Sequence, residues 1–311
     1  MTLHNGTRNL RLPLRLKPIF DTNIFGHVQS ELIPQSDWRF LLKRRPRYGW
    51  PLSLPTVLEL LAGLDGIRSD KFPNLQAQVK LAFDLPRGRV LEDPMPMLCR
   101  EVLHIPFPAR LATPAGSMLH HYMEVVRRAT TFAQVFRGVP YRGLEARLGT
   151  TSAVNDLVSN LKKQWVSALE EIATAKNPTW RELFHKQGRR LPPEVRREIE
   201  PLSAWKIEKR FFIEILLRDL LDTKPEPAFV DVMMERFSAV VEFSMFVLRA
   251  FLIGNYSIEK NSSDVVDQFQ LRYLAIDRFV IVTGDPDLSK RTARSPQADR
   301  IMTFHGFLQT L

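Results

Sequence analysis

The sequence predicts a mixed α/β protein whose strands lie near the two ends of the chain and whose middle is helical. Short apolar runs of strand length occur before residue 98 and after residue 257, whereas the residues between them repeat apolar side chains at helical spacing. An α/β pattern that stops and later resumes indicates an insertion. We therefore expect residues 1–98 and 257–311 to meet in space as one domain, and residues 99–256 to form an all-helical insertion domain.

The first part of the chain contains strand and helix signals in alternation. Pro55 precedes a helical pattern and suits the first turn of a helix, where its missing N–H costs nothing. The predicted elements are a strand at Pro18–Phe20, short strands at "WPLSLP" (50–55) and Arg89–Glu92, and helices from Thr56 to about Leu64 and near Leu75–Phe83.

The middle of the chain predicts long amphipathic helices separated by segments rich in Pro, Gly and charge. The helices are expected at Ser152–Ala175, Ala204–Leu221 and Phe229–Ile253. After residue 257 the α/β signals return, with a helix at Ser263–Leu274, a buried strand at Phe279–Val282, and a final short strand and helix in "RIMTFHGFLQTL" (300–311).

The composition indicates a cytoplasmic protein with a polyanionic partner. Lys and Arg outnumber Asp and Glu by 44 to 34, a net charge of +10 that favours nucleic acid as the partner. The single cysteine, Cys99, excludes an intramolecular disulfide and a cysteine-based zinc site.

The N-terminal sequence is a poor match to a secretory signal peptide. The longest apolar stretch contains Glu242 and Arg249, so we expect a buried helix there and no membrane span.

Two predicted strands end in an acid, Asp21 in "PIFDTN" and Asp285 in "FVIVTGD". Ligands of open α/β sheets bind outside the carboxyl ends of the strands, so these two acids are expected to converge on a site. Each has an ordinary alternative as a turn residue or helix N-cap.

Three further acids lie on predicted helices near these strands. Glu59 stands among leucines in "LPTVLELLAGL", where a carboxylate is unusual unless it faces a site or solvent. Asp264 and Asp267 open the helix before the last long strand, and their spacing places them on one helix face. Asp264 also suits an N-cap.

Four carboxylates within about 5 Å of one another would repel by roughly 3 kcal/mol per pair at an effective dielectric near 20. A cation would let them coexist ionised, and oxygen ligands without Cys or His favour Mg²⁺ or Mn²⁺. Such a group predicts metal-assisted hydrolysis of phosphodiester bonds.

The motifs together resemble the PIN-domain nuclease family. The order is "FDTNIF", a helical Glu in "LPTVLELLAGL", and "SDVVDQFQLRYLAIDRFVIVTGDPDL", in which Asp267 lies 18 residues before Asp285. The resemblance covers residues 16–98 and 257–311.

The resemblance implies a PIN-like α/β/α sandwich with a central parallel sheet, interrupted in this chain by the helical insertion. It also implies a Mg²⁺- or Mn²⁺-dependent nuclease, most often acting on RNA, so the expected function is that of an endoribonuclease. The acids carried over as catalytic and metal-binding residues are Asp21, Glu59, Asp267 and Asp285, with Asn23, Thr283 and Asp264 in support.

Other functions remain open at this point. A catalytically inactive PIN-like scaffold that binds RNA or a protein through the helical insertion is one alternative, and a DNA-directed nuclease is another. The insertion could also bind a protein partner or mediate formation of a homo-oligomer.

Phosphate contacts are expected from two basic runs, through Arg44, Arg45, Arg47, Lys290 and Arg291, although such runs can also be solvated faces. The chain has no phosphate-binding P-loop and no nucleophile elbow, so NTPase and serine-hydrolase functions are not supported.

Overall fold

The computed structural model describes residues 17–46, 49–62, 64, 70–85, 90–91, 94–108, 116–137, 159, 206–221, 225–252, 256, 261 and 263–311. Its centre is a small parallel sheet of three strands, β1 (Lys17–Phe20), β2 (Phe279–Val282) and β3 (Ile301–Met302), with β2 in the middle. β1 pairs with β2 in the register Ile19↔Ile281, so the first and last parts of the chain share one sheet, as the sequence predicts.

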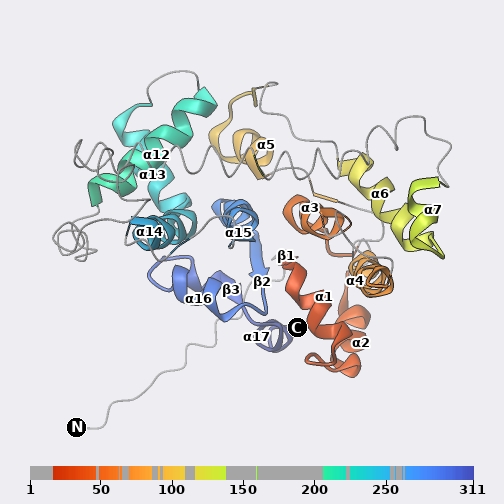
Figure 1. Ribbon diagram of the computed structural model, residues 1–311. Coiled ribbons are helices and arrows are strands. Elements are labelled where there is room, and N and C mark those ends of the chain that lie inside the picture. The colour runs from red at the N-terminus through yellow and green to blue at the C-terminus, as the bar shows by residue number, and fades with distance from the viewer. Residues whose placement is uncertain are drawn as a thin grey trace, which may run out of the picture.

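Helices from the first half of the chain lie mostly on one side of this sheet (Figure 1). Their bounds are α1 (Thr22–Gln29), α2 (Gln35–Arg44), α3 (Leu54–Ala62), α4 (Phe72–Asp84), α5 (Pro94–Leu98), a π-helical turn η1 (Cys99–Leu103), α6 (Gly116–Arg128) and α7 (Phe132–Arg137).

The remaining described helices follow residue 205. They are α12 (Lys206–Leu221), α13 (Pro227–Arg236), α14 (Ser238–Leu252), α15 (Ser263–Leu271) with the 3₁₀ turn η4 (Arg272–Ala275), α16 (Pro286–Thr292), the 3₁₀ turn η5 (Ala298–Arg300) and α17 (Phe304–Leu308). The mixed α/β class is therefore confirmed, with helices in the majority among the described residues. None of the described helices is both long enough and apolar enough to cross a bilayer.

Alternation along the strands divides the core between the two faces of the sheet, because successive strand residues point to opposite sides. Ile19 and Ile281 pack with apolar residues of α12, α13 and α14, whereas Phe20, Val280 and Val282 pack with residues of α1 to α4, α6 and α17. Helices on both faces bury all four residues of the central strand β2, which explains its uninterrupted apolar sequence.

Helices of the predicted insertion contribute to both of these cores. Leu119, Met123 and Val126 of α6 belong to one, and Ile213 of α12 and Phe243 of α14 to the other. The predicted boundaries at residues 98 and 257 stay predictions. The predicted helix Ser152–Ala175 falls outside the described residues, Ser159 excepted.

Two predicted short strands meet at an isolated parallel bridge in the part of the chain that the structure describes. The bridge pairs Leu52 with Val90, and the Leu91 amide donates to the Leu52 carbonyl at 2.7 Å. Arg89 and Glu92, the ends of one predicted strand, lie outside the described residues. Pro51 and Pro55 flank Leu52 and offer no N–H for a ladder, and Leu54 already begins α3.

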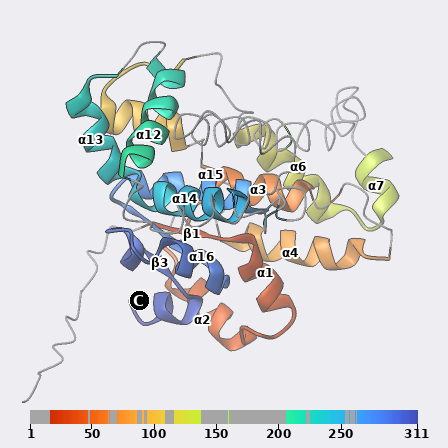
Figure 2. The same cartoon turned by 60° about the vertical axis from the view of Figure 1, so that its left-hand side comes forward.

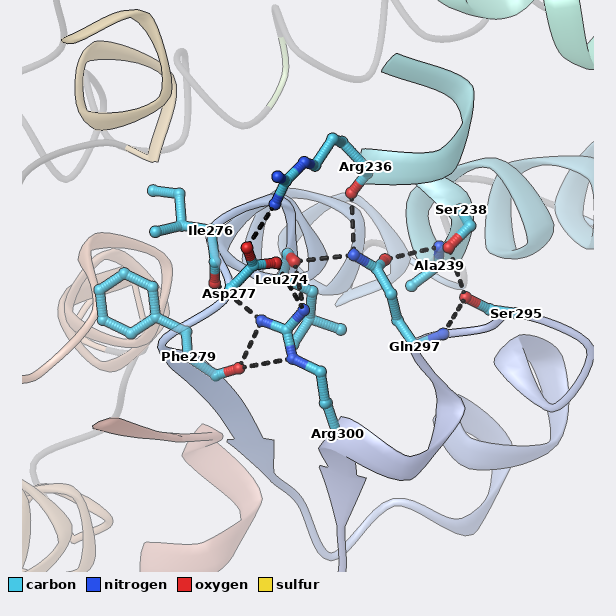
Figure 3. A network of polar contacts seen from close by, with 10 residues as sticks. All are labelled: Arg236, Ser238, Ala239, Leu274, Ile276, Asp277, Phe279, Ser295, Gln297 and Arg300. Carbon is cyan, nitrogen blue, oxygen red and sulfur yellow. Dashed lines mark hydrogen bonds and ion pairs between the residues drawn. The ribbon is translucent and has the colours of Figure 1, made fainter. Parts of the chain in front are cut away.

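The single helix predicted at Phe229–Ile253 is wrong, because the chain breaks at Phe237 into α13 and α14. Gln297 joins the two helices at this break (Figure 3): its amide donates to the Arg236 carbonyl at 2.9 Å and accepts from the Ala239 N–H at 3.1 Å. The same amide also donates to the Leu274 carbonyl at 2.7 Å. A distant side chain therefore satisfies backbone groups that an unbroken helix would satisfy itself.

Arg300 ties the turn between α15 and β2 to the rest of the sheet (Figure 3). Its guanidinium donates to the backbone carbonyls of Leu274 at 2.8 Å, Ile276 at 2.7 Å and Phe279 at 2.7 Å. These bonds hold η4, which directly follows α15, against the start of β2. Since α15 carries Asp267 and β2 leads to Asp285, they also hold the two elements that carry candidate acids.

Candidate active site

The parallel pairing of β1 and β2 places Asp21 and Asp285 at the same edge of the sheet. Phe20 lies opposite Val282, and the Asp21 amide donates to the Val282 carbonyl at 2.9 Å. Asp285 follows three residues after Val282. The two strand-terminal acids therefore lie at the carboxyl ends of neighbouring strands, where α/β sheets bind their ligands.

Asp21 is buried, with 3% of its surface exposed, and both of its carboxylate oxygens accept hydrogen bonds. Oδ1 accepts from the Thr22 amide at 2.7 Å, which makes Asp21 the N-cap of α1. Oδ2 accepts from Asn23 Nδ2 at 2.6 Å and from the Thr283 hydroxyl at 2.7 Å. Burial raises the pKa of Asp21, and these hydrogen bonds oppose that rise. Asp21 is thus both an N-cap and a fixed, oriented carboxylate.

Asn23 also joins the two ends of the chain directly. Its Oδ1 accepts a hydrogen bond from the Gly284 amide at 2.8 Å. A Cβ at Gly284 would lie 2.4 Å from the ring of His27 and 3.2 Å from Asn23 Oδ1, so only glycine allows this approach without movement. Gly284 and His27 are therefore part of the site's framework, although their sequence pattern gives no sign of it.

Glu59 lies near this group because α3 is anchored to the end of β1. The Thr56 hydroxyl donates to the Phe20 carbonyl at 2.8 Å, and Thr22 donates to Glu59 Oε2. Burial and the neighbouring Asp21 raise the pKa of Glu59 to about 7, against the opposing hydrogen bond from Thr22. Thr22 is a supporting residue that the sequence motifs did not single out; its hydroxyl beside an acid in "DTN" was the available signal.

Asp267 comes from α15, which lies beside α3 in both views (Figures 1 and 2). Only 8% of its surface is exposed, and within the described residues its carboxylate accepts no hydrogen bond and forms no ion pair. Its pKa is raised well above the ordinary value, first by burial and then by the negative charges of Asp21, Glu59, Asp264 and Asp285. Mutual repulsion of this kind indicates that the acids predicted to converge lie close enough to interact.

The structure separates Asp264 from Asp267. Asp264 Oδ1 accepts from Arg291 at 2.7 Å and Oδ2 accepts from the Tyr256 hydroxyl at 2.7 Å, so both oxygens have protein partners. Asp264 is buried, with 5% of its side chain exposed, and Arg291 is partly buried, with 17% of its side chain exposed. In the described chain, Asp267 alone of these two has unpartnered oxygens. Asp267 is therefore the better candidate ligand, and Asp264 is held by a cation that the protein itself supplies.

Asp285 is half-buried, and among the described residues one of its carboxylate oxygens accepts a hydrogen bond. Its Oδ1 accepts from the Asp287 amide at 2.7 Å, which makes Asp285 the N-cap of α16. The Asp285 amide in turn donates to the Thr283 hydroxyl at 2.9 Å. Thr283 therefore connects Asp21 and Asp285 through one hydroxyl.

The donor set of this cluster suits a hard divalent cation. All four candidates are carboxylates, and the buried carboxylate of Asp267 lacks any donor in the described chain. As the side chains stand, no three His, Cys, Asp or Glu residues in the described ranges form a group arranged around a metal position. The chemistry of the donors therefore fits Mg²⁺ or Mn²⁺, and binding of such an ion would draw the carboxylates closer together.

The five basic residues expected to bind nucleic acid lie in different environments. Arg44 donates to the Leu311 carbonyl at 3.2 Å, and Arg45 donates to the Asp84 carbonyl. Lys290 is exposed and forms an ion pair with Asp287 at 3.1 Å, whereas the partly buried Arg291 forms an ion pair with Asp264. Arg47 lies outside the described residues. Of the described four, only Arg291 contacts one of the five acids named in the sequence analysis, Asp264.

Comparison with known proteins finds no match to this chain among protein-family models, curated proteins or solved structures. The likeness to the PIN family therefore rests on the sequence motifs alone.

Proposed function

We propose that this protein is a metal-dependent nuclease that hydrolyses RNA. The observation that carries the proposal is the buried carboxylate of Asp267, which has no partner of its own in the described chain and is repelled by neighbouring acids at the carboxyl edge of the sheet. A cation is the ordinary means of keeping such a group ionised.

In this proposal Asp21, Glu59, Asp267 and Asp285 hold Mg²⁺ or Mn²⁺. The bound ion would lower the pKa of a water molecule and balance the charge that develops on the phosphate. Asn23 and Thr283 keep both oxygens of Asp21 in fixed directions. Thr22 orients Glu59, and Arg291 keeps Asp264 out of the ligand set.

The choice of RNA as substrate is supported by charge and by motif. A net charge of +10 favours a polyanion, and counterion release makes such binding strong at low salt. The motif order resembles nucleases that most often act on RNA. A nuclease acting on DNA would use the same four acids, so substrate assays decide between the two.

The test compares Asp21→Asn and Asp267→Asn with wild type in cleavage of single-stranded RNA, with Mn²⁺ or EDTA. We expect each substitution to reduce cleavage by about 100-fold or more, because a ligand carboxylate is lost at nearly constant volume. Asp231→Asn is the matched control, since the Asp231 side chain is 65% exposed on α13. Undiminished cleavage by Asp21→Asn would overturn the proposal.

Two further measurements separate the alternatives. Calorimetric titration with Mn²⁺ should show binding by wild type and weaker binding by Asp267→Asn. Parallel assays with single-stranded DNA and branched duplexes test for a DNA-directed nuclease. No cleavage of any substrate, together with tight RNA binding, would favour a non-catalytic RNA-binding protein.

A further inference from the structure

Arg291 has donors that the described chain does not use. Its Nη1 donates to Asp264, and in the described residues no acceptor receives a hydrogen bond from Nε or Nη2. The side chain retains 17% exposure, so these N–H groups are not sealed inside the protein. A guanidinium fixed through one nitrogen and open at the others is suited to bind an oxyanion.

Two aromatic rings of α14 flank this guanidinium. Its central carbon lies 5.5 Å from the ring centre of Phe243 and 5.3 Å from that of Phe246. Phe243 is fully buried, whereas Phe246 is 47% exposed. The Phe246 ring therefore presents an accessible surface next to a charged group that it helps to hold in place.

Arg291 and Phe246 lie at the border of the group of candidate metal-binding acids, which are Asp21, Glu59, Asp267 and Asp285. α16 begins directly after Asp285 and carries Arg291, and α14 packs against both α15 and α16. Burial by itself would lower the pKa of Arg291, but the charges of Asp264, Asp267 and Asp285 outweigh it and raise that pKa. The guanidinium is thus charged and close to the acids that are proposed to hold the metal.

We propose that Arg291 and Phe246 form a binding site for one nucleotide of an RNA strand, next to the bond to be cleaved. The N–H groups of Nε and Nη2 bind phosphate oxygens, and the exposed Phe246 ring stacks on a base. Such pairs of a basic side chain and an aromatic ring are a usual means of holding single strands without sequence preference. This inference rests on the proposed function, because it assigns RNA as the ligand.

The test is fluorescence anisotropy with a labelled single-stranded RNA of about six nucleotides, a length near one binding site, in EDTA so that no cleavage occurs. Phe246→Ala and Phe246→Leu should each weaken binding by about 10-fold, within the range for loss of one stacked base. Phe246→Leu keeps an apolar contact with Arg291. A loss of RNA affinity in both variants therefore shows that the aromatic ring itself is needed for binding.

Leu32→Ala is the control. Leu32 is an apolar side chain that is 71% exposed, and it belongs to none of the basic runs or candidate acids. The RNA affinity of Leu32→Ala should equal that of wild type. Unchanged affinity in Phe246→Ala, or an equal loss in Leu32→Ala, would overturn the proposal.

The phosphate part is tested with inorganic polyphosphate as a competitor, since it has no bases. Arg291→Lys keeps the charge but not the planar fork, and it should weaken both RNA and polyphosphate binding, whereas Phe246→Ala should weaken RNA binding alone. Equal polyphosphate affinity in Arg291→Lys and wild type would contradict the phosphate contact. All readouts are of binding, so they are independent of cleavage. Absence of cleavage by wild type would overturn the nuclease proposal and the position beside a cleaved bond, whereas the RNA contacts of Arg291 and Phe246 stand or fall with these affinities.

Discussion

Asn23 Oδ1 accepts a hydrogen bond from the amide of Gly284 at 2.8 Å, across 261 residues of sequence. The same Asn23 side chain donates to Asp21 Oδ2 at 2.6 Å, so one amide connects the acid after β1 to the backbone after β2. This connection aligns the ends of two parallel strands. It makes the geometry of the site depend on how closely Gly284 approaches α1.

Gly284→Ala should therefore reduce cleavage by about 10-fold or more and lower the free energy of unfolding by ~1 kcal/mol, because the added Cβ would overlap the His27 ring. The double variant His27→Ala/Gly284→Ala removes the overlap and should recover part of the activity. Gly26→Ala serves as the control, since its Cβ would meet Gln78 at an ordinary 3.7 Å. Equal activity of Gly284→Ala and wild type would contradict the role given to this approach.

Thr22→Val should raise the pKa of Glu59 further, because it removes the hydroxyl that donates to Glu59 while keeping the size of the side chain. A higher pKa leaves less of the ionised ligand near neutrality. We expect cleavage at pH 7 to fall by about 10-fold and to recover at higher pH. Thr22→Ser keeps a donor and should restore the wild-type pH profile; a profile identical in all three proteins would rule out this role for Thr22.

Metal-free stability should fall as pH rises from about 4.5 to about 7. Over this range folded Glu59, with its pKa raised to about 7, keeps a proton that the unfolded chain has lost, so the free energy of unfolding decreases with pH. The effect of this one group is roughly 3 kcal/mol. Urea unfolding in EDTA at several pH values measures it.

Glu59→Gln is the reference for that experiment, because it cannot ionise and should show a smaller fall over the same range. The difference between the two proteins isolates Glu59 from groups such as Glu124, whose pKa is lowered to about 2 and whose contribution changes only in acid. Adding Mn²⁺ above pH 7 should stabilise wild type more than Glu59→Gln. Parallel stability curves would show that Glu59 has no raised pKa.

Arg300→Lys should destabilise the fold by about 2–3 kcal/mol, because one ammonium cannot reach the three carbonyls that the guanidinium bridges. Arg236→Lys is the control, because Arg236 pairs with Asp277, whose side chain is 78% exposed. This substitution should lower the free energy of unfolding by less than about 1 kcal/mol. Urea unfolding measures both. Similar losses for the two variants would show that the carbonyl contacts are not what matters at Arg300.

Local sequence determined the elements whose signal lies within a few residues. β1 and β2 follow their apolar runs, and α3, α4, α12 and α15 begin within a few residues of their predicted starts. The acids at the strand ends followed from the same patterns, because parallel strands deliver their carboxyl ends to one edge. The predicted turn or N-cap use of Asp21 and Asp285 is also correct, since each caps a helix.

Tertiary structure decided the features that depend on partners distant in sequence. The pattern "SDVVD" treats Asp264 and Asp267 alike, and only the positions of Arg291 and Tyr256 give Asp264 two partners and leave Asp267 with none in the described chain. The break at Phe237 likewise depends on Gln297. Periodicity reports which side of an element is buried, whereas hydrogen-bond partners and charge neighbours are set by how the elements pack.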